Sequence, residues 1–232
     1  MPEKKLFQID LKSAGLAQQV YRTLRAAILN GTLTPGENLR QENIAIELGV
    51  SQTTVRDALN QLVGEGLAVR IPYKGVHVIT LSAADLQDIY EIRTVLEGIA
   101  AREAAKQINA ETLAEMRRIL PASFVTENPA SVQQAREVNR KFHELVIEAS
   151  QRQYLIRVLR QLWNWIDPQM LYSRTTTLEI GLETRVKWGQ QDRYQHTRLL
   201  EALESGDSEK ASQAATEAVL EAWDNLATIV FE

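Results

Sequence analysis

The sequence predicts a mainly α protein in two parts, and two observations support this prediction. In the first 80 residues, short apolar stripes at helical spacing precede two short runs with β character. From Ser82 onward, helical periodicity continues almost without interruption. We therefore expect three helices and a hairpin over residues 1–80, of which 1–13 form a flexible arm. A bundle of six or seven helices is expected over residues 81–232.

Composition limits the class of protein. The 232 residues are enough for one or two domains with buried cores. The absence of cysteine excludes disulfide scaffolds and cysteine-based zinc modules, and it fits a reducing compartment. The sequence has neither an apolar run of about 18 to 20 residues nor the apolar core of a signal peptide. We therefore expect a cytoplasmic protein without a membrane span.

The net charge of −4 is unevenly distributed along the chain. Residues 1–80 carry nine Lys or Arg against seven Asp or Glu, whereas the remainder carries 17 against 23. The slight basic excess is compatible with a nucleic-acid partner for the first part alone.

Three helices and a hairpin are predicted in the first part. Apolar residues at steps of four predict a helix over residues 14–30. A second short helix ends at Gly49, which can adopt a left-handed cap, and Ser51 is a suitable N-cap for a third helix that runs to about Gly64. The predicted strands are Leu67–Arg70 and His77–Leu81, around a basic, glycine-containing tip at residues 72–75.

The second part reads as consecutive helices. Ser82 and Asp85 resemble a capping pair at the start of the first of them. Further helices are expected near 110–120, 131–150, 153–172, 182–205 and 208–229, with breaks at Pro121, at 128–129, around Asp167-Pro168 and at 205–207.

The third helix combines an apolar stripe with a polar first turn, Ser51-Gln52-Thr53-Thr54, followed by Arg56. Two short helices joined by a tight glycine-containing turn form a helix-turn-helix, whose second helix presents its N-terminal residues to base edges in the major groove. Lys74 and Gly75 at the hairpin tip would then belong to a wing. The alternative is a capped amphipathic helix of any helical protein, but the full series of elements favours a winged helix-turn-helix.

The segment IAIELGVSQTTVRDALNQLVGEGLAVRIPYKGVHV makes residues 15–80 resemble the winged helix-turn-helix of the GntR family. The segments DIYEIRTVLEGIAA, NRKFHELVIEAS and QHTRLLEALESGD make residues 83–228 resemble the all-α helical-bundle effector domain of its FadR-like branch. The resemblance implies a sequence-specific transcriptional regulator. It would bind an inverted repeat in double-stranded DNA as a homodimer, and it would be a repressor that a small-molecule effector releases.

The resemblance also implies which residues contact DNA. The family usually has Arg where this chain has Gln52, and often Pro where it has Thr54. Because Arg suits guanine and Gln suits adenine, we expect an operator that differs from the usual half-site. Arg40 and Arg70 are either phosphate contacts or solvated surface charges. The full set of DNA-binding candidates is Arg40, Ser51, Gln52, Thr53, Thr54, Arg56, Arg70, Lys74 and Gly75.

The resemblance to the FadR-like branch also raises the question of a metal site in the helical part. Asn139 and His143 are four residues apart and share one helix face. Metal-binding members of the branch have Asp and His at these positions, a third ligand at the position of His196, and a fourth His where this chain has Ala218. Neutral Asn is a weak ligand and Ala cannot coordinate. We therefore expect no required cofactor, with zinc or nickel at Asn139, His143 and His196 as the less favoured alternative.

The helical part is expected to bind the effector. Arg93 matches positions that resemble carboxylate-binding ones in the family, which suggests a carboxylate effector; the alternative is an ion pair of Arg93 with Glu97 or Glu144. His143 and His196 either line a metal-free pocket or are hydrogen-bonded core histidines. The effector-binding candidates are Arg93, Asn139, His143, Tyr172 and His196.

Two rival functions stay open at this level. An enzyme could use His143 and His196 in the bundle, with Glu144 and Asp192, for acid–base chemistry. The sequence contains no nucleophile elbow, phosphate loop or HExxH pattern, so we do not expect an enzyme. The second rival is an adaptor that dimerises through the bundle without sensing a ligand.

Overall fold

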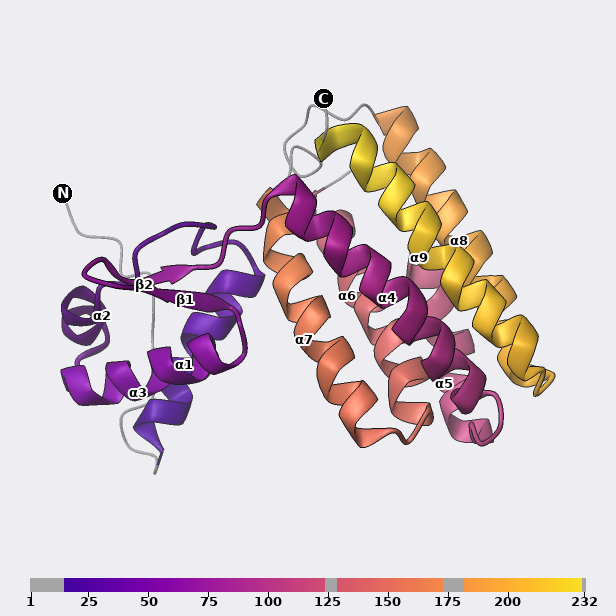
Figure 1. Cartoon of the computed structure of the whole chain (residues 1–232), viewed down its shortest axis with the longest axis horizontal. Helices are drawn as coiled ribbons and strands as arrows, with labels where there is room; N and C mark the ends of the chain where they lie inside the picture. The colour runs from indigo at the N-terminus through magenta and orange to yellow at the C-terminus, as the bar shows by residue number, and fades with distance from the viewer. Residues whose placement is uncertain (1–14, 124–128, 173–181, 231–232) are drawn as a thin grey trace. The chain divides into compact units, whose positions relative to one another are not determined.

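The computed structural model describes residues 15–123, 129–172 and 182–230 (Figure 1). The predicted arm at residues 1–13 lies outside the described residues. The chain divides into two compact units, one of Met1–Leu81 with Trp163–Thr176 and one of Ser82–Leu162 with Thr177–Glu232.

The N-terminal unit has the predicted order of three helices and a hairpin. Its elements are α1 (Leu16–Leu29), α2 (Gln41–Leu48), α3 (Gln52–Gly64), β1 (Ala68–Ile71) and β2 (Gly75–Val78). The strands are antiparallel, with Ala68 opposite Val78 and Ile71 opposite Gly75. This is a winged helix-turn-helix, in which the turn 72–74 with β1 and β2 forms the wing.

The prediction for the second strand was wrong in its position. A strand over 77–81 was expected, but β2 begins at Gly75 and ends at Val78. The reason is the tight turn: the backbone N–H of Lys74 donates to the carbonyl of Ile71 at 3.1 Å, so pairing resumes at the next residue. The first strand is likewise displaced by one residue, to Ala68–Ile71.

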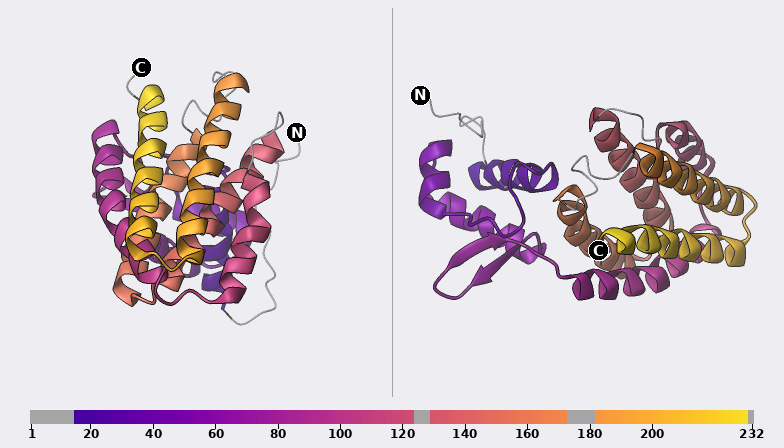
Figure 2. Two further views of the ribbon diagram at one scale, coloured as in Figure 1. Left: turned by 90° about the vertical axis from the view of Figure 1, so that its right-hand side faces the viewer. Right: turned by 90° about the horizontal axis from the view of Figure 1, so that it is seen from above.

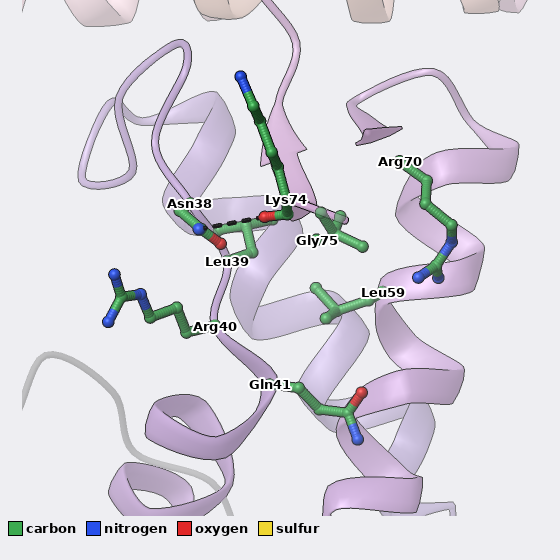
Figure 3. Close-up of a pocket in the computed structure, with 9 residues that line it drawn as sticks. Asn38, Leu39, Arg40, Gln41, Leu59, Arg70, Lys74 and Gly75 are labelled. Atoms are coloured by element: carbon green, nitrogen blue, oxygen red, sulfur yellow. Dashed lines mark hydrogen bonds between the residues drawn. The ribbon is translucent and has the colours of Figure 1, made fainter. Parts of the chain in front are cut away.

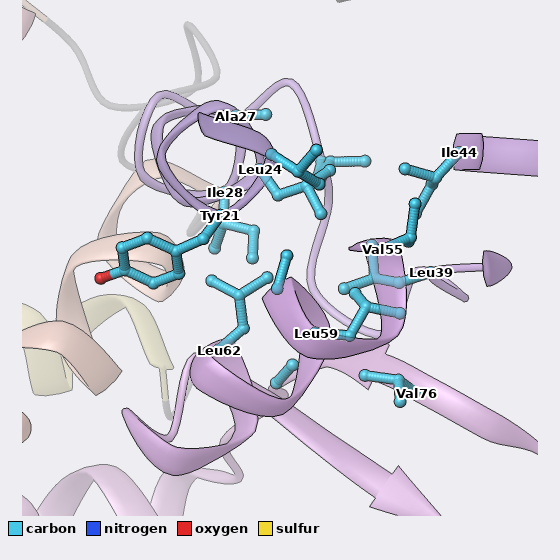
Figure 4. Packing of buried hydrophobic residues seen from close by; sticks show 14 of the residues in the cluster. Tyr21, Leu24, Ala27, Ile28, Leu39, Ile44, Val55, Leu59, Leu62 and Val76 are labelled. Atoms are coloured by element: carbon cyan, nitrogen blue, oxygen red, sulfur yellow. The ribbon is translucent and has the colours of Figure 1, made fainter. Parts of the chain in front are cut away.

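The core of this unit lies between α1 and α3 (Figure 4). Val20, Leu24 and Ile28 of α1 are fully buried against the apolar stripe of α3. Each fully buried aliphatic side chain stabilises a fold by roughly 1.5–3 kcal/mol. Because this packing holds the apolar side of α3, the polar side of the helix is available to solvent.

The predicted caps are present at the end of α2 and at the start of α3. Gly49 ends α2 with φ 68°, a left-handed conformation that glycine adopts without steric cost. The hydroxyl of Ser51 accepts a hydrogen bond from the backbone N–H of Thr54 at 3.1 Å. The prediction that the third helix begins after Ser51 is confirmed.

The second unit is all-helical. The elements that follow Ser82 are α4 (Ala83–Ala104), α5 (Ala110–Ile119), a 3-10 turn (Leu120–Ser123), α6 (Pro129–Ala149), α7 (Gln153–Tyr172), α8 (Leu182–Glu204) and α9 (Ser208–Val230). Of these, α7 is divided at Trp163, and its second part belongs to the first unit. The helix α4 packs along α9 and α6, and α8 packs along α9 (Figure 2). Gly98 of α4 allows a close approach to α9, because a Cβ there would lie 2.7 Å from the hydroxyl of Thr216. Among the described helices, none combines the length and the apolar character needed to cross a bilayer.

One predicted break is absent. The helix α7 continues through Pro168 to Tyr172, whereas a break around Asp167-Pro168 was expected. A proline removes one backbone donor and disturbs the preceding turn, which kinks a helix without necessarily ending it. The predicted capping pair is confirmed, since Ser82 and Asp85 form a complete capping box at the start of α4.

Candidate nucleic-acid interface and buried polar cluster

The first turns of α3 present polar side chains to solvent, as predicted. Gln52 and Thr53 are exposed, and the side chain of Arg56 is 58% exposed, with its Nε 4.0 Å from the carboxylate of Asp57. At such a distance on an exposed surface, the Asp57 contact holds Arg56 only weakly. These three side chains can therefore reach a partner without losing strong internal bonds.

The two remaining residues of this turn have internal partners. The hydroxyl of Ser51 caps the helix and lies 2.8 Å from the hydroxyl of Thr54. Because the cap satisfies a backbone donor, both hydroxyls contribute to the start of the helix itself. Ser51 and Thr54 therefore support the first turn, while Gln52, Thr53 and Arg56 project from it.

Gln41 makes a contact beside the recognition helix that the sequence analysis did not predict. Its side-chain amide donates to the backbone carbonyl of Gln52 at 2.8 Å, which joins the first turn of α2 to the first turn of α3. No local pattern indicates such a bond, because its two partners are eleven residues apart on different helices. The bond restrains the angle between the two helices of the helix-turn-helix.

Four of the predicted DNA contacts come together. Arg40, Arg70, Lys74 and Gly75 line a hollow of about 220 Å³ beside the wing (Figure 3). The charged ends of Arg40 and Lys74 extend away from it, whereas Arg70 donates to the side chain of Asn60 on α3 at 2.7 Å. Residues from the start of α2, from β1 and from the wing turn thus form one basic surface.

Tyr73 of the wing turn has a conformation that the sequence analysis did not predict. It lies in the wing turn after Pro72, is fully exposed, and has φ 62°. A left-handed conformation is uncommon for a bulky side chain and costs of order 1–3 kcal/mol. The turn is therefore strained, and its neighbours must hold it in place.

A buried polar cluster lies within the second unit, formed by Arg93, Glu97, His143 and His196. Arg93 donates to the carboxylate of Glu97 at 2.7 Å, and both side chains are 3% exposed. The other carboxylate oxygen of Glu97 accepts from Nδ1 of His143 at 3.0 Å. Nε2 of His143 in turn lies 3.2 Å from Nε2 of His196. Three helices, α4, α6 and α8, thus contribute to one hydrogen-bonded chain.

Arg93 forms an ion pair within the bundle in this structure, and its role as an effector contact stays a prediction. Its guanidinium pairs with Glu97 and lies 4.7 Å from the ring centre of Tyr90, an arrangement that combines an ion pair with a cation–π contact. The other suggested partner, Glu144, pairs with Arg160. The alternative of an ion pair within the bundle is therefore the one observed.

Glu97 and His196 of this cluster both have lowered pKa values, for different reasons. Burial by itself would raise the pKa of Glu97, but the charges of Arg93 and His143 and the hydrogen bonds from both lower it to about 2. For His196, burial lowers the pKa to about 3, and the neighbouring His143 acts in the same direction. At neutral pH, Glu97 is therefore ionised and His196 is neutral.

Asp192, one turn before His196 on α8, adds an acidic group. Its side chain is accessible to water although protein surrounds it, and this desolvation raises its pKa to about 6. His143 lowers that pKa and Glu221 raises it.

Three other positions belong to the predicted effector-binding or metal-ligand sets. Asn139 lies one turn before His143 on α6 and is half-buried. Tyr172 ends α7, but its side chain lies outside the described residues. Ala218 of α9 is half-buried and offers no ligand atom.

The donor set does not fit a tight metal site. In the part of the chain that the structure describes, no group of three or more His, Cys, Asp or Glu side chains is placed to hold a metal. His143 and His196 supply two imidazoles, but the two other positions of the branch hold Asn139 and Ala218. Structural zinc sites use four strong ligands and catalytic ones use three, so two imidazoles are insufficient.

Two family models match this architecture. The FCD domain matches residues 88–221, and the bacterial regulatory proteins of the gntR family match residues 16–78. The chain belongs to the GntR family. Its winged helix-turn-helix and its FCD domain are those of a DNA-binding transcriptional regulator, and the family consists of regulators rather than enzymes. The interpretation of His143 and His196 as catalytic residues is therefore set aside.

Individual relatives agree with this assignment. The HTH-type transcriptional regulator McbR of Escherichia coli is 30% identical over 162 residues, 70% of this chain and 73% of that protein. A probable D-xylose utilization operon transcriptional repressor of Paenarthrobacter nicotinovorans is 30% identical over 202 residues, 87% of this chain and 84% of that protein. The solved structure of E. coli McbR/YncC superposes with a TM-score of 0.73 at 25% identity, covering 94% of this chain and 98% of that one.

Proposed function

We propose that this GntR-family regulator is a cytoplasmic homodimeric repressor that binds an inverted repeat and is released by a small-molecule effector. The observation that supports operator binding best is the exposed set of Gln52, Thr53 and Arg56 on the first turns of α3. Base edges are read by side chains at this end of a recognition helix. The helix N-terminus also favours phosphate.

The basic surface beside the wing would position the winged helix-turn-helix on the DNA duplex. Arg40, Lys74 and Gly75 line one hollow, and Arg70 is tied to α3 through Asn60. We propose that Arg40 and Lys74 contact phosphates and that Gly75 lets the backbone of the wing approach DNA closely. Phosphate contacts of this kind set register and orientation, whereas α3 carries sequence preference.

We propose that the dimer forms through the outer faces of α4 and α9. Ile92 and Val95 on α4 are 47% and 62% exposed, and Leu220 on α9 is 47% exposed. These helices pack together, so their exposed apolar residues lie on adjoining elements. Exposed apolar side chains that gather in this way mark interaction surfaces. Two copies related by a two-fold axis would present two recognition helices to the two half-sites.

We propose that the effector binds beside the polar cluster, with His143, His196 and Asn139 among its contacts. Among the described residues, none lies within hydrogen-bond distance of Nδ1 of His196, although the ring is buried. Buried polar atoms normally have a partner, so a ligand or water is expected there. Tyr172 stays a predicted contact.

The chemistry of the cluster favours an effector with hydrogen-bond donors. The carboxyl of Asp192 offers acceptors, and Nδ1 of neutral His196 is an acceptor when its hydrogen lies on Nε2. A carboxylate effector stays a prediction, and it would compete with Glu97 for Arg93. A polyol or an amine matches these acceptors better. The name of the Paenarthrobacter relative connects that protein with D-xylose utilisation, so D-xylose is a suitable polyol probe.

Operator binding is tested with DNA from upstream of the protein's own gene. Arg56→Ala should weaken specific binding by roughly 1–3 kcal/mol and relax sequence preference. Arg117→Ala, which removes an exposed arginine that pairs with Glu204 in the FCD domain, is the matched control and should leave binding unchanged. Affinity should fall steeply with rising salt because phosphate contacts release counterions. Equal effects of the two substitutions would place the recognition surface elsewhere.

Effector sensing is tested by thermal stabilisation of the full chain with polyols, including D-xylose, with aliphatic amines and with carboxylates. A ligand that binds only the folded state raises the melting temperature by mass action. The His196→Phe variant should lose that shift while it still binds operator DNA. A ligand that stabilises the protein and weakens DNA binding supports a sensing repressor, whereas stabilisation without any effect on DNA binding contradicts release. A protein that no probe class stabilises would fit the dimeric adaptor.

A further inference from the structure

Tyr73 lies in the wing turn between β1 and β2, and its side chain is fully exposed. In the part of the chain that the structure describes, this side chain forms no hydrogen bond, ion pair or ring contact. Single exposed apolar side chains are common on protein surfaces, so exposure alone does not indicate a role. It does mean that the ring adds no packing to the core of its unit.

The backbone conformation at Tyr73 is unfavourable for this residue type. The N–H of Lys74 donates to the carbonyl of Ile71 at 3.1 Å, so residues 71–74 form a β-turn with Pro72 at its second position. With φ 62° at the third position, the turn matches type II, in which glycine or asparagine is expected there. Tyrosine therefore strains the turn without adding packing. Residues held in such conformations cluster at functional sites.

The turn that carries the ring is restrained and cationic. The side-chain amide of Asn38 donates to the carbonyl of Lys74 at 3.3 Å, and Ile71 pairs with Gly75 across the hairpin. Lys74 follows Tyr73 directly, and its ammonium extends away from the hollow beside the wing (Figure 3). A ring on a restrained, positively charged turn suits a duplex partner.

Such a ring matches the minor groove of DNA better than the phosphates. Phosphate oxygens offer it only a hydrogen bond to the hydroxyl, whereas the minor groove offers sugars and base edges to its apolar faces. A·T and G·C pairs differ in this groove by the 2-amino group of guanine, which occupies space that an inserted ring needs. Narrow A·T segments also attract lysine through their more negative potential, so Lys74 would favour the same sequences.

We infer that Tyr73 is a specificity-determining residue of the wing, whose ring enters the minor groove beside the bases that α3 reads and favours A·T pairs there. The inference rests on the proposed operator binding. The tight turn keeps the ring outside the fold before DNA arrives, so little conformational freedom is lost on binding. Tyr73 thus adds a minor-groove preference to the major-groove contacts of α3.

The first test compares the parent with Tyr73→Asn on a duplex carrying the inverted repeat that the parent selects from a random DNA pool. Asparagine tolerates φ 62° and lacks the ring. By fluorescence anisotropy the variant should bind about tenfold more weakly, the order expected for one lost base contact. Its melting temperature should equal or exceed that of the parent, because the strain is relieved. Parent-like affinity overturns the inference, and so does weaker binding with a lower melting temperature, which would make Tyr73 a support of the wing.

The second test distinguishes the minor groove from the DNA backbone. 2,6-Diaminopurine, placed instead of adenine at each A·T pair of the repeat in turn, adds an amino group to the minor groove and leaves the major-groove edge unchanged. At one symmetric position or more, it should weaken binding of the parent about tenfold and of Tyr73→Asn by less than about twofold. Equal effects on both proteins at every position would assign Tyr73 to the backbone and overturn the inference. A selected repeat without any A·T pair also overturns it.

Three controls separate other causes. Tyr73→Phe keeps the ring and should retain both the affinity and the diaminopurine effect; loss of both would assign the role to the hydroxyl and contradict the inference. Lys74→Ala should weaken binding to normal and diaminopurine duplexes alike, as the loss of a phosphate contact does. Tyr154→Asn removes a tyrosine of α7 that is 81% exposed, and it should leave binding unchanged. If Tyr73→Asn does not fold, Tyr73→Gly replaces it, because glycine also suits this turn position.

The inference and the proposed function fail in different ways. A parent that selects no sequence from the pool contradicts the proposed operator binding, and the inference with it. A parent that selects a repeat and binds it no more tightly than Tyr73→Asn does contradicts the role of Tyr73 alone.

Discussion

Nε2 of His143 and Nε2 of His196 lie 3.2 Å apart in the interior of the FCD domain, and a single proton can lie between them. Nδ1 of His143 donates to Glu97, and the position of the proton between the two rings decides whether Nδ1 of neutral His196 carries a hydrogen or a lone pair. The hydrogen-bonded chain that begins at Glu97 thus sets what His196 offers to a ligand.

The ion pair of Arg93 and Glu97 should be costly to break. Arg93→Met leaves a buried carboxylate without its main partner and should lower the free energy of unfolding by roughly 3–5 kcal/mol. Arg93→Met with Glu97→Leu should recover most of that loss, because no unpaired charge then remains. Chemical denaturation measures both. Arg117→Met, at an exposed pair with Glu204, should cost about 0–1 kcal/mol. An Arg93 variant as stable as this control would contradict the burial of the pair.

The FCD domain should lose stability in mild acid through His196. Its folded pKa is about 3, against 6.5 for the free side chain. Between these values the unfolded chain binds more protons than the folded one, so stability falls as pH falls from 6.5 toward 3. The slope from one group is at most about 1.4 kcal/mol per pH unit. His196→Phe should flatten the profile between pH 5 and pH 7.

Asp192 acts in the opposite direction and must be removed for that measurement. Its folded pKa of about 6 exceeds the ordinary 3.8, so the folded state binds more protons between these values. Its contribution to stability therefore rises as pH falls through this window. Asp192→Asn is the suitable background, and it should itself steepen the acid loss. A profile that His196→Phe leaves unchanged in this background would mean that His196 is solvated.

Gln52 should set one position of the operator. If its side chain reads adenine, Gln52→Arg should shift preference toward guanine at one symmetric position in each half-site, since Arg binds the guanine edge bidentately. Selection from a random DNA pool, carried out with both proteins, measures this. Thr53→Ala provides a comparison at the neighbouring exposed position. The same selected motif from the parent and from Gln52→Arg would assign Gln52 to solvent or phosphate.

A metal site should be restorable. Asn139→Asp with Ala218→His adds a carboxylate and an imidazole to His143 and His196. Zinc or nickel should then raise the melting temperature of the double variant, because metal that binds only the folded state stabilises it. The parent should show little shift and should not keep metal through dialysis against a chelator. Stoichiometric metal in the chelated parent would contradict the metal-free prediction, and a double variant without any gain would mean that the four positions do not converge.

The sequence by itself determined the elements and the surface of α3, because the signals involved are local. Ser51 as an N-cap, Gly49 as a left-handed cap and the apolar stripe of α3 act over one or two helical turns. Such patterns predict which residues are buried and which first turn is polar. The boundaries of β2 and the course of α7 through Pro168 depend on hydrogen bonds that composition does not indicate.

Only the tertiary structure decided how the polar residues are paired. Arg93 could have met Glu97 or Glu144, and it pairs with Glu97, which the packing of α4 against α6 joins to His143 and, through His143, to His196 of α8. His77 acquires its two carbonyl partners only when the loop at Gly36 lies beside β2. Local sequence determines the direction of a side chain along its own helix or strand. The partner of a buried polar group depends on elements far away in the chain.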